Sequence, residues 1–367
     1  MNALLQAISL GQFQLSSRIA MAPLTRARAG AHGVPTELNA RYYRQRASAG
    51  LIISEATNVS PMSAAFEDAP GIYTQEQVRG WQAVASAVHE VGGRIFMQLW
   101  HSGRASSYAL LDGAAPLSPS GVNEDLGALQ VYGALRNGYY TRISASPSRA
   151  MSVDEIHQVV REFRTGARNA ADAGLDGVEI HAANGYLLQQ FLSSHVNRRT
   201  DQFGGSVDNR ARLLRLVIEA VLQELPPERI GVRLSPFALY NNATDADISA
   251  THATYAYVTA MLDEFGVAYI HAADTNAWGG TRQMDSILDI IRPHFGGTLI
   301  ANAGLSFDEA EQLIATGKAD MAAFGRPFIA NPDLVARIAQ GGPFNVPDPV
   351  TFYGGDAIGY TDYPTLA

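Results

Sequence analysis

The segment SVDEIHQVVREFRTGARNAADAGLDGVEIHA, Ser152–Ala182, contains the unit that predicts the fold. Its first part, Ser152–Ala173, carries apolar residues at helical spacing. Its last part, Gly177–Ala182, is a short apolar run typical of a buried strand. Alternation of helices and strands is the pattern of proteins built around a parallel sheet.

This alternation runs along almost the whole chain. Helical spacing also occurs in Thr36–Ala49, Gln75–Val91 and Ser206–Glu224. Eight runs are typical of strands: Ile19–Pro23, Leu51–Thr57, Arg94–Trp100, Gly177–Ala182, Ile230–Pro236, Tyr269–Asp274, Thr298–Gly304 and Met321–Pro327. Eight strand–helix units predict a (β/α)₈ TIM barrel, although a doubly wound sheet shows the same alternation. We expect one barrel domain over residues 1–367.

One connection is much longer than the others. Residues 101–149 separate the third strand-like run from its helix and are rich in Gly, Pro and Ser. Loops of this length inside a compact domain are usually functional. We predict that this insertion forms a lid or subdomain over the active-site face, with a plain surface excursion as the alternative.

Composition and charge exclude several classes of protein. Hydrophobic residues make up 47% of the 367 residues, which is enough for a large core, and the net charge of −8 opposes nucleic-acid binding. The absence of cysteine excludes disulfides and thiolate chemistry. No apolar run reaches the ~20 residues of a membrane span. A secretory signal would begin with basic residues, whereas the first basic residue here is Arg18. We expect a cytoplasmic enzyme with small-molecule substrates, either monomeric or homodimeric.

The ends of the strand-like runs lack several common chemistries. In a barrel of this kind, the working residues follow the strands at their C-terminal ends. Lys318 is the one lysine and precedes the eighth run, so no lysine is placed for a Schiff base. No His-rich cluster has the spacing of metal ligands, and no GxGxxG follows a strand, so neither a metal site nor a Rossmann fold is predicted.

The ends of the seventh and eighth runs predict a phosphate site. The motifs ANAGLS, Ala301–Ser306, and AFGRPF, Ala323–Phe328, place glycines where backbone N–H groups can meet an anion. One phosphate site without a second nucleotide motif favours FMN over FAD. Many barrels bind phosphorylated sugars in the same place, so this motif pair alone leaves the ligand open.

Motifs along nearly the whole chain resemble the Old Yellow Enzyme family. They are APLTRAR at Ala22–Arg28, YYRQRASAGLIISEAT at Tyr42–Thr57, QLWHSGR at Gln98–Arg104, VEIHAANGYLLQQFLSSHVNRRTDQFGGS at Val178–Ser206, GVRLSP at Gly231–Pro236, AFGRPFIANPDLV at Ala323–Val335 and FYGG at Phe352–Gly355. Their order and spacing also match. The resemblance implies non-covalent FMN at the mouth of the barrel.

The resemblance also implies which residues contact the flavin. Thr25, which places the chain in the threonine-bearing subgroup, would hydrogen-bond flavin O4, and Gln98 would contact the pyrimidine edge. Arg233 would stabilise the negative charge that collects near N1 and O2 on reduction, with a buried ion pair to Glu179 as the alternative. The full cofactor-binding set is Pro23, Leu24, Thr25, Ala56, Gln98, Arg233, Ala303, Gly304, Gly325 and Arg326.

Three residues at the end of the fourth run are the expected catalytic groups. His181 and Asn184 would donate hydrogen bonds to one carbonyl or nitro oxygen of the substrate. Tyr186 would donate a proton to Cα on the face opposite the flavin, and an ordinary half-buried tyrosine is the alternative.

The remaining expected contacts are with substrate and coenzyme. Arg142 in the insertion would bind NADPH or NADH, beside aromatic residues that could stack on adenine. The aromatic members of the expected substrate wall could equally be core residues. This wall comprises Phe66, Trp100, Asn241, Trp278 and Tyr353.

The resulting function is ping-pong reduction of activated C=C bonds by NAD(P)H through FMN. Enones, maleimides, nitroalkenes and nitrate esters all present an acceptor oxygen to two donors. Alternatives are another FMN barrel, such as a hydroxy-acid oxidase or dihydroorotate-type dehydrogenase, and a non-catalytic flavin binder. A hydrolase using Glu55 and Glu179 is a further alternative, but it leaves Arg233 and the phosphate site without a purpose.

Overall fold

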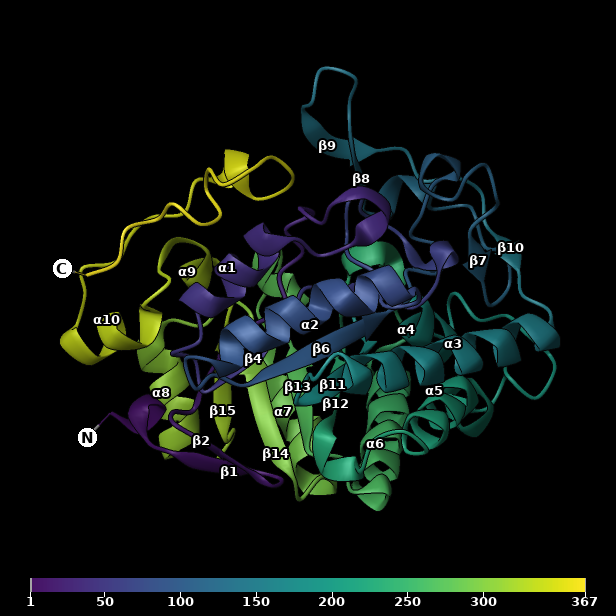
Figure 1. The fold of residues 1–367 in the computed structure, drawn as a ribbon. Helices are drawn as coiled ribbons and strands as arrows, with labels where there is room; N and C mark the ends of the chain where they lie inside the picture. The colour runs from purple at the N-terminus through teal and green to yellow at the C-terminus, as the bar shows by residue number, and fades with distance from the viewer. Residues whose placement is uncertain (1, 367) are drawn as a thin grey trace.

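The computed structural model describes residues 2–366, and a closed parallel barrel lies at their centre (Figure 1). Pairing of β15 with β3 and of β6 with β11 closes the sheet. The barrel prediction is confirmed and the doubly wound alternative is wrong. The eight strands are β3 (Ile19–Met21), β4 (Leu51–Ile53), β6 (Ile95–Trp100), β11 (Gly177–Ala182), β12 (Ile230–Leu234), β13 (Tyr269–Ala273), β14 (Thr298–Asn302) and β15 (Met321–Phe324).

Most strands start where the sequence predicts and end earlier, although β6 starts one residue late, at Ile95, and ends at Trp100 as predicted. β11 has the predicted bounds, whereas β14 stops at Asn302 and β15 at Phe324, before the glycines that follow. β3 stops at Met21, and Pro23, which has no N–H to donate to a ladder, lies beyond it. The residues predicted as strand ends have therefore left the ladder, which frees their backbone groups for a ligand.

Helices surround the barrel on its outside (Figure 1). Helix α3 (Val153–Asp172) begins at a capping box in which Ser152 and Glu155 bond each other's backbone N–H. Its buried face includes Ile156, Val159 and Phe163, which explains the helical spacing in the sequence. The other helices are α1 (Glu37–Gln45), α2 (Gln75–His89), α4 (Leu187–Leu192), α5 (Val207–Val221), α6 (Ile248–Phe265), α7 (Met284–Ile291), α8 (Phe307–Ala315), α9 (Arg326–Ala330) and α10 (Leu334–Gln340).

An apolar cluster inside the barrel closes its N-terminal end. The hairpin of β1 (Ile8–Leu10) and β2 (Phe13–Leu15) contributes to this cluster together with early residues of the barrel strands. The Phe13 ring meets the Phe96 ring at 6.0 Å between centroids. Because one end is filled in this way, the C-terminal ends of the strands are left to form a site.

The 101–149 insertion contains short elements of its own. It carries β7 (Leu117–Ser118), which pairs with β10 (Arg149–Ala150), and a hairpin of β8 (Val131–Ala134) and β9 (Tyr140–Ile143) that stands at the top of Figure 1. The insertion is bridged to Phe66 through Tyr132, and the two rings stack at 4.8 Å between centroids. A further short strand, β5 (Thr57–Asn58), pairs with β6. The lid function and the single-domain organisation stay predictions. No helix between residues 2 and 366 combines the length and apolarity needed to cross a membrane.

Candidate active site

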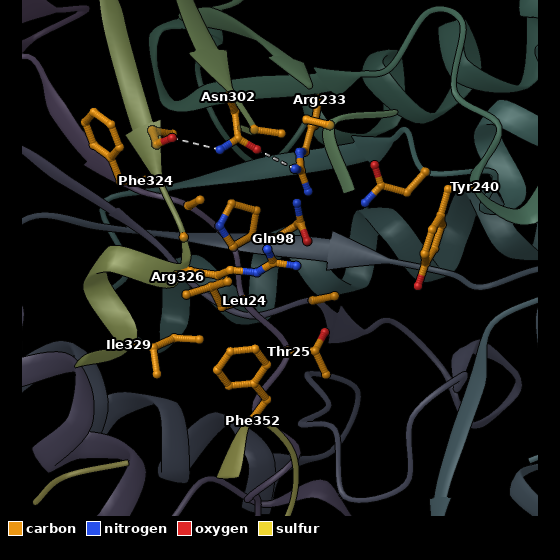
Figure 2. A pocket seen from close by; sticks show the side chains of 18 of the residues that line it. Leu24, Thr25, Gln98, Arg233, Tyr240, Asn302, Phe324, Arg326, Ile329 and Phe352 are labelled. Carbon is orange, nitrogen blue, oxygen red and sulfur yellow. Dashed lines mark hydrogen bonds between the residues drawn. The ribbon is translucent and has the colours of Figure 1, made fainter. Parts of the chain in front are cut away.

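A cavity of about 370 Å³ opens at the C-terminal ends of the barrel strands (Figure 2). Its volume falls in the range of small-molecule and cofactor sites. It brings together most of the residues singled out from the sequence, although they are spread over more than 300 positions. Those that line it are Pro23, Leu24, Thr25, Ala56, Phe66, Gln98, His181, Asn184, Tyr186, Arg233, Ala303, Gly304, Gly325, Arg326 and Tyr353.

Trp100, one of the two tryptophans expected in the substrate wall, does not line the cavity. Trp100 is wholly buried, and its ring meets those of Phe66 and Tyr186 at 6.3 Å and 5.0 Å. It therefore supports the wall from behind. The side chain of Trp278 lies outside the described part of the structure, so its predicted contact stays a prediction.

Asn241 and Arg142 do not line the cavity in this structure. The Asn241 side chain is buried and donates to the Asn184 carbonyl at 2.9 Å. The Arg142 guanidinium donates to the carbonyls of Gly127 and Leu129, which ties the β9 strand to the preceding turn. The predicted substrate and coenzyme contacts of these two residues stay predictions.

The turn after β11 is held by side-chain hydrogen bonds. Asn184 has a φ of 58° and Gly185 one of 69°, so the chain turns sharply here. The Asn184 N–H donates to Ser235 Oγ at 2.8 Å and the Gly185 N–H to Gln189 Oε1 at 2.7 Å. The turn thus fixes the directions of Asn184 and Tyr186 relative to β11.

Burial controls the protonation of the two titratable groups at this turn. Burial lowers the pKa of His181 well below its ordinary value, and the positive charge of Arg233 adds to the effect. His181 is therefore neutral at physiological pH. Burial also raises the pKa of Tyr186, so this phenol keeps its proton. The His181 and Tyr186 rings meet edge to face at 5.0 Å.

Some of the polar atoms at this end of the cavity lack a protein partner. His181 Nδ1, Asn184 Oδ1 and Arg233 Nε are buried without a hydrogen bond to any residue in 2–366. Buried polar groups normally have partners, and those at a cavity are candidates for ligand contacts.

Arg233 is held by a neutral residue. Its Nη2 donates to Asn302 Oδ1 at 2.7 Å, and Asn302 Nδ2 donates to the Ala323 carbonyl at 2.8 Å (Figure 2). The expected alternative was an ion pair with Glu179. Within residues 2–366, no carboxylate lies at ion-pair distance from Arg233. The charge of Arg233 therefore remains available to the cavity.

The Glu179 carboxylate is hydrogen-bonded to two residues other than Arg233. It accepts hydrogen bonds from Gln98 Nε2 at 2.7 Å and from His271 Nδ1 at 2.8 Å. Burial opposes its ionisation, but His271 and Arg233 outweigh burial and hold its pKa below the ordinary value. Glu55 is likewise buried and accepts from the Arg26 and Ala27 N–H groups. Neither carboxylate lines the cavity, so the alternative interpretation as a two-carboxylate hydrolase is wrong.

The end of the cavity at β14 and β15 is built mostly from backbone. Ala303 and Gly304 have φ values of 85° and 68°, the left-handed region that favours glycine. A Cβ on Gly304 would lie 2.5 Å from the Ala277 Cβ, so the close approach requires glycine. Arg326, at the start of α9, is exposed beside them.

Sequence reasoning missed three polar residues that line the cavity: Tyr132, Tyr240 and Asn302. Asn302 lies inside the quoted ANAGLS motif and Tyr132 inside the insertion. Both segments had been assigned a role, but the directions of individual side chains were not predictable. Tyr240 follows the GVRLSP motif in a loop without a local pattern.

A protein-family model matches most of this chain. The NADH:flavin oxidoreductase / NADH oxidase family matches residues 3–345. The chain belongs to this family. The resemblance to the Old Yellow Enzyme family is confirmed, and the chain is a flavin-dependent oxidoreductase.

Several proteins similar to this Old Yellow Enzyme family member match it over nearly their full lengths. The "Probable flavin mononucleotide-dependent alkene reductase" of Leishmania infantum is 38% identical over 100% of this chain and 98% of its own. Morphinone reductase in complex with tetrahydroNAD is 43% identical, with a TM-score of 0.92, and the match covers 99% of this chain and 98% of that one. The Old Yellow Enzyme homologue of Zymomonas mobilis is 38% identical with a TM-score of 0.91, over 99% of this chain and 100% of that one.

In this Old Yellow Enzyme family member, the residues of the cavity fit FMN. The unpartnered Arg233 Nε offers a cation to the electron-rich edge of a flavin, and Thr25 and Gln98 offer uncharged polar groups. The glycine-requiring backbone at Gly304 and the exposed Arg326 suit one phosphate. No group of three or more His, Asp or Glu residues among those described could hold a metal ion.

Proposed function

We propose that this enzyme reduces electron-poor C=C bonds with NADPH or NADH as the hydride donor, in a ping-pong cycle. FMN, when bound in the cavity, would take hydride from the nicotinamide and deliver it to the alkene Cβ. The observation that carries the proposal is that His181, Asn184 and Tyr186 line one cavity with Arg233. Two of the relatives, an alkene reductase and a reductase bound to tetrahydroNAD, support the same reaction.

His181 and Asn184 bind the acceptor oxygen of the substrate. A neutral imidazole and an amide each offer N–H donors, and both residues lie at the end of β11. Two donors at one oxygen draw electrons from the alkene and stabilise the enolate as negative charge develops. Enones, maleimides and nitroalkenes all carry such an oxygen, as do nitrate esters.

Tyr186 supplies the proton to Cα. Its phenol is protonated because burial raises its pKa, and it lies on the same turn as Asn184. The enolate carbon is much more basic than a phenolate, so a positioned phenol is a competent acid.

The cofactor is held by two kinds of contact. Thr25 and Gln98 bind the ring edge, with Pro23, Leu24 and Ala56 against it, and Arg233 stabilises its reduced form. Ala303, Gly304, Gly325 and Arg326 bind the phosphate.

The proposal also covers the substrate pocket, the coenzyme contact, the domain organisation and the location of the protein. Phe66 and Tyr353, which line the cavity, contact the substrate. Arg142 of the insertion contacts the nicotinamide coenzyme. Residues 1–367 form one domain, with the insertion as its lid. The cytoplasm, where NAD(P)H is supplied, is the proposed location.

The test is stopped-flow kinetics of Tyr186→Phe with a cyclic enone and a nitroalkene side by side. Reduction of the enzyme by NADPH should survive, because it needs no proton from Tyr186. The enone rate should fall by about 10²–10⁴-fold, the usual value of a positioned general acid. The nitroalkene rate should change much less, since its nitronate can leave unprotonated. If both substrates slow equally, or neither slows, Tyr186 is not the donor.

A further inference from the structure

Tyr240 is a second phenol beside the proposed proton donor. It begins the short 3₁₀ turn Tyr240–Asn242 after β12 and lines the cavity (Figure 2). Tyr186 lines the same cavity. A hydrogen bond joins the two side chains, and it lowers the pKa of Tyr186 and raises that of Tyr240, which is the pattern expected when the Tyr240 hydroxyl donates to the Tyr186 oxygen. The sequence motifs give Tyr240 no role.

The two turns that carry these tyrosines are fixed to each other. Asn241 Nδ2 donates to the Asn184 carbonyl at 2.9 Å, and Asn241 Oδ1 accepts from the Gln130 N–H at 2.7 Å. A Cβ on Gly185 would lie 2.5 Å from the Tyr240 carbonyl oxygen, so the backbones are in close contact. The backbone segments that carry the two phenols are therefore held close together.

The hydrogen bond opposes the effect of burial. Burial raises the pKa of both phenols, which makes Tyr186 a weaker acid. The hydrogen bond from Tyr240 lowers the pKa of Tyr186 again. The other groups that face Tyr186 are Tyr353 and Tyr132, which raise its pKa, and Arg233, which lowers it.

We propose that Tyr240 is a positioning residue for proton transfer, which aims the Tyr186 hydroxyl and stabilises the phenolate that forms. The inference rests on the proposed role of Tyr186. As the Tyr186 O–H bond breaks and the Cα–H bond forms, the electron pair stays on the Tyr186 oxygen. The Tyr240 hydroxyl then donates to an anion, and such hydrogen bonds are about twice as strong as neutral ones. A proton from water restores Tyr186 before the next turnover.

The first test is Tyr240→Phe, which removes the hydroxyl and keeps the ring. The rate of enone reduction should fall about tenfold, the effect expected for one hydrogen bond to a charged group. The solvent deuterium isotope effect on this step should rise, because proton transfer becomes more limiting. Reduction by NADPH, FMN affinity and phenol binding should not change, which excludes a folding defect.

The matched control is Tyr132→Phe. Tyr132 lines the same cavity, but its hydroxyl donates to Gln130 Oε1 at 3.2 Å. The same loss of a phenolic oxygen should leave the isotope effect at its wild-type value. An equal effect of both substitutions would show that cavity polarity is responsible and would overturn the inference.

The second test is Tyr240→Phe in the Tyr186→Phe background. If Tyr240 acts through Tyr186, the double variant should be no slower with the enone than Tyr186→Phe alone. A further tenfold loss would overturn this inference and leave the proposed donor intact. A Tyr186→Phe enzyme with normal enone kinetics would instead overturn the donor itself, and the inference with it.

Discussion

The two ends of the cavity are built by different means. At the end of β11, the polar groups that line the cavity belong to side chains, and Asn184 and Gly185 are fixed by hydrogen bonds to Ser235 and Gln189. At the ends of β14 and β15, the polar groups that line the cavity are mostly backbone, and Gly304 has a left-handed φ there. Arg326, the cation at this end, is exposed.

This difference fits what each end is proposed to recognise. An acceptor oxygen that gains charge only during the reaction needs donors held in a dry, fixed geometry. A phosphate is charged at all times, so several N–H groups and an exposed arginine suffice. Substitutions at the β11 end should therefore affect chemistry and ligand binding, and those at the β14–β15 end should affect retention of the cofactor.

The largest effect is expected at the β11 end, for His181→Ala combined with Asn184→Ala. Phenolates imitate the enolate oxygen, so they should bind over the flavin and give a long-wavelength charge-transfer band. Two lost hydrogen bonds to a charged oxygen should cost several kcal/mol, at roughly 1.5–3 kcal/mol each. Titration of the holoenzyme with a phenol measures this. A band of normal affinity in the double variant would contradict the donor role.

At the other end, Gly304→Ala should weaken FMN binding by about tenfold. A residue with a Cβ pays about 1–2 kcal/mol in the left-handed region, and the new Cβ would also meet Ala277. Fluorescence titration of the apoenzyme with FMN gives the affinity. Gly317→Ala is the control, because its φ of 72° is similar but no heavy atom lies within 4 Å of the added Cβ. An equal loss in both variants would indicate strain alone.

A smaller effect is expected where the two ends meet, at Asn302. Asn302→Ala removes the hydrogen bond that orients Arg233, so the reduced flavin should be less stabilised and the midpoint potential should fall. A tenfold change in the relative affinity for reduced flavin corresponds to about 30 mV. Asn302→Asp should lower the potential further, since a carboxylate would offset the guanidinium. Unchanged potentials in both variants would exclude this role for Asn302.

The smallest effect is an expected absence of pH dependence at the β11 end. The pKa of His181 lies well below its ordinary value because of burial, so the imidazole is neutral above that lowered pKa. Phenol binding should therefore follow the ionisation of the phenol alone, without a break near the ordinary histidine value of about 6.5. A pH titration of the charge-transfer band checks this. A break at that value would show that His181 is protonated on the way to the complex.

Much of the fold was predictable because it depends on local patterns. Helix α3 and strand β11 have almost the predicted bounds, since the helical spacing and the apolar run reflect burial directly. The ends of β14 and β15 were predicted too far along the chain. Apolar and small residues continue into the loop there, and only the ladder hydrogen bonds show where pairing stops.

The sequence by itself determined the barrel and the flavin family, because both show in local patterns and motifs. It also determined which groups stand at the end of β11, because a strand alternates its faces and places Glu179 and His181 on the same side. The tertiary structure alone decided that Tyr240 meets Tyr186 and that Asn302, instead of Glu179, holds Arg233. It also placed Trp100 behind the cavity wall. The physical reason is that loop residues take their directions from contacts distant in sequence, such as that between Asn241 and Asn184, 57 positions apart.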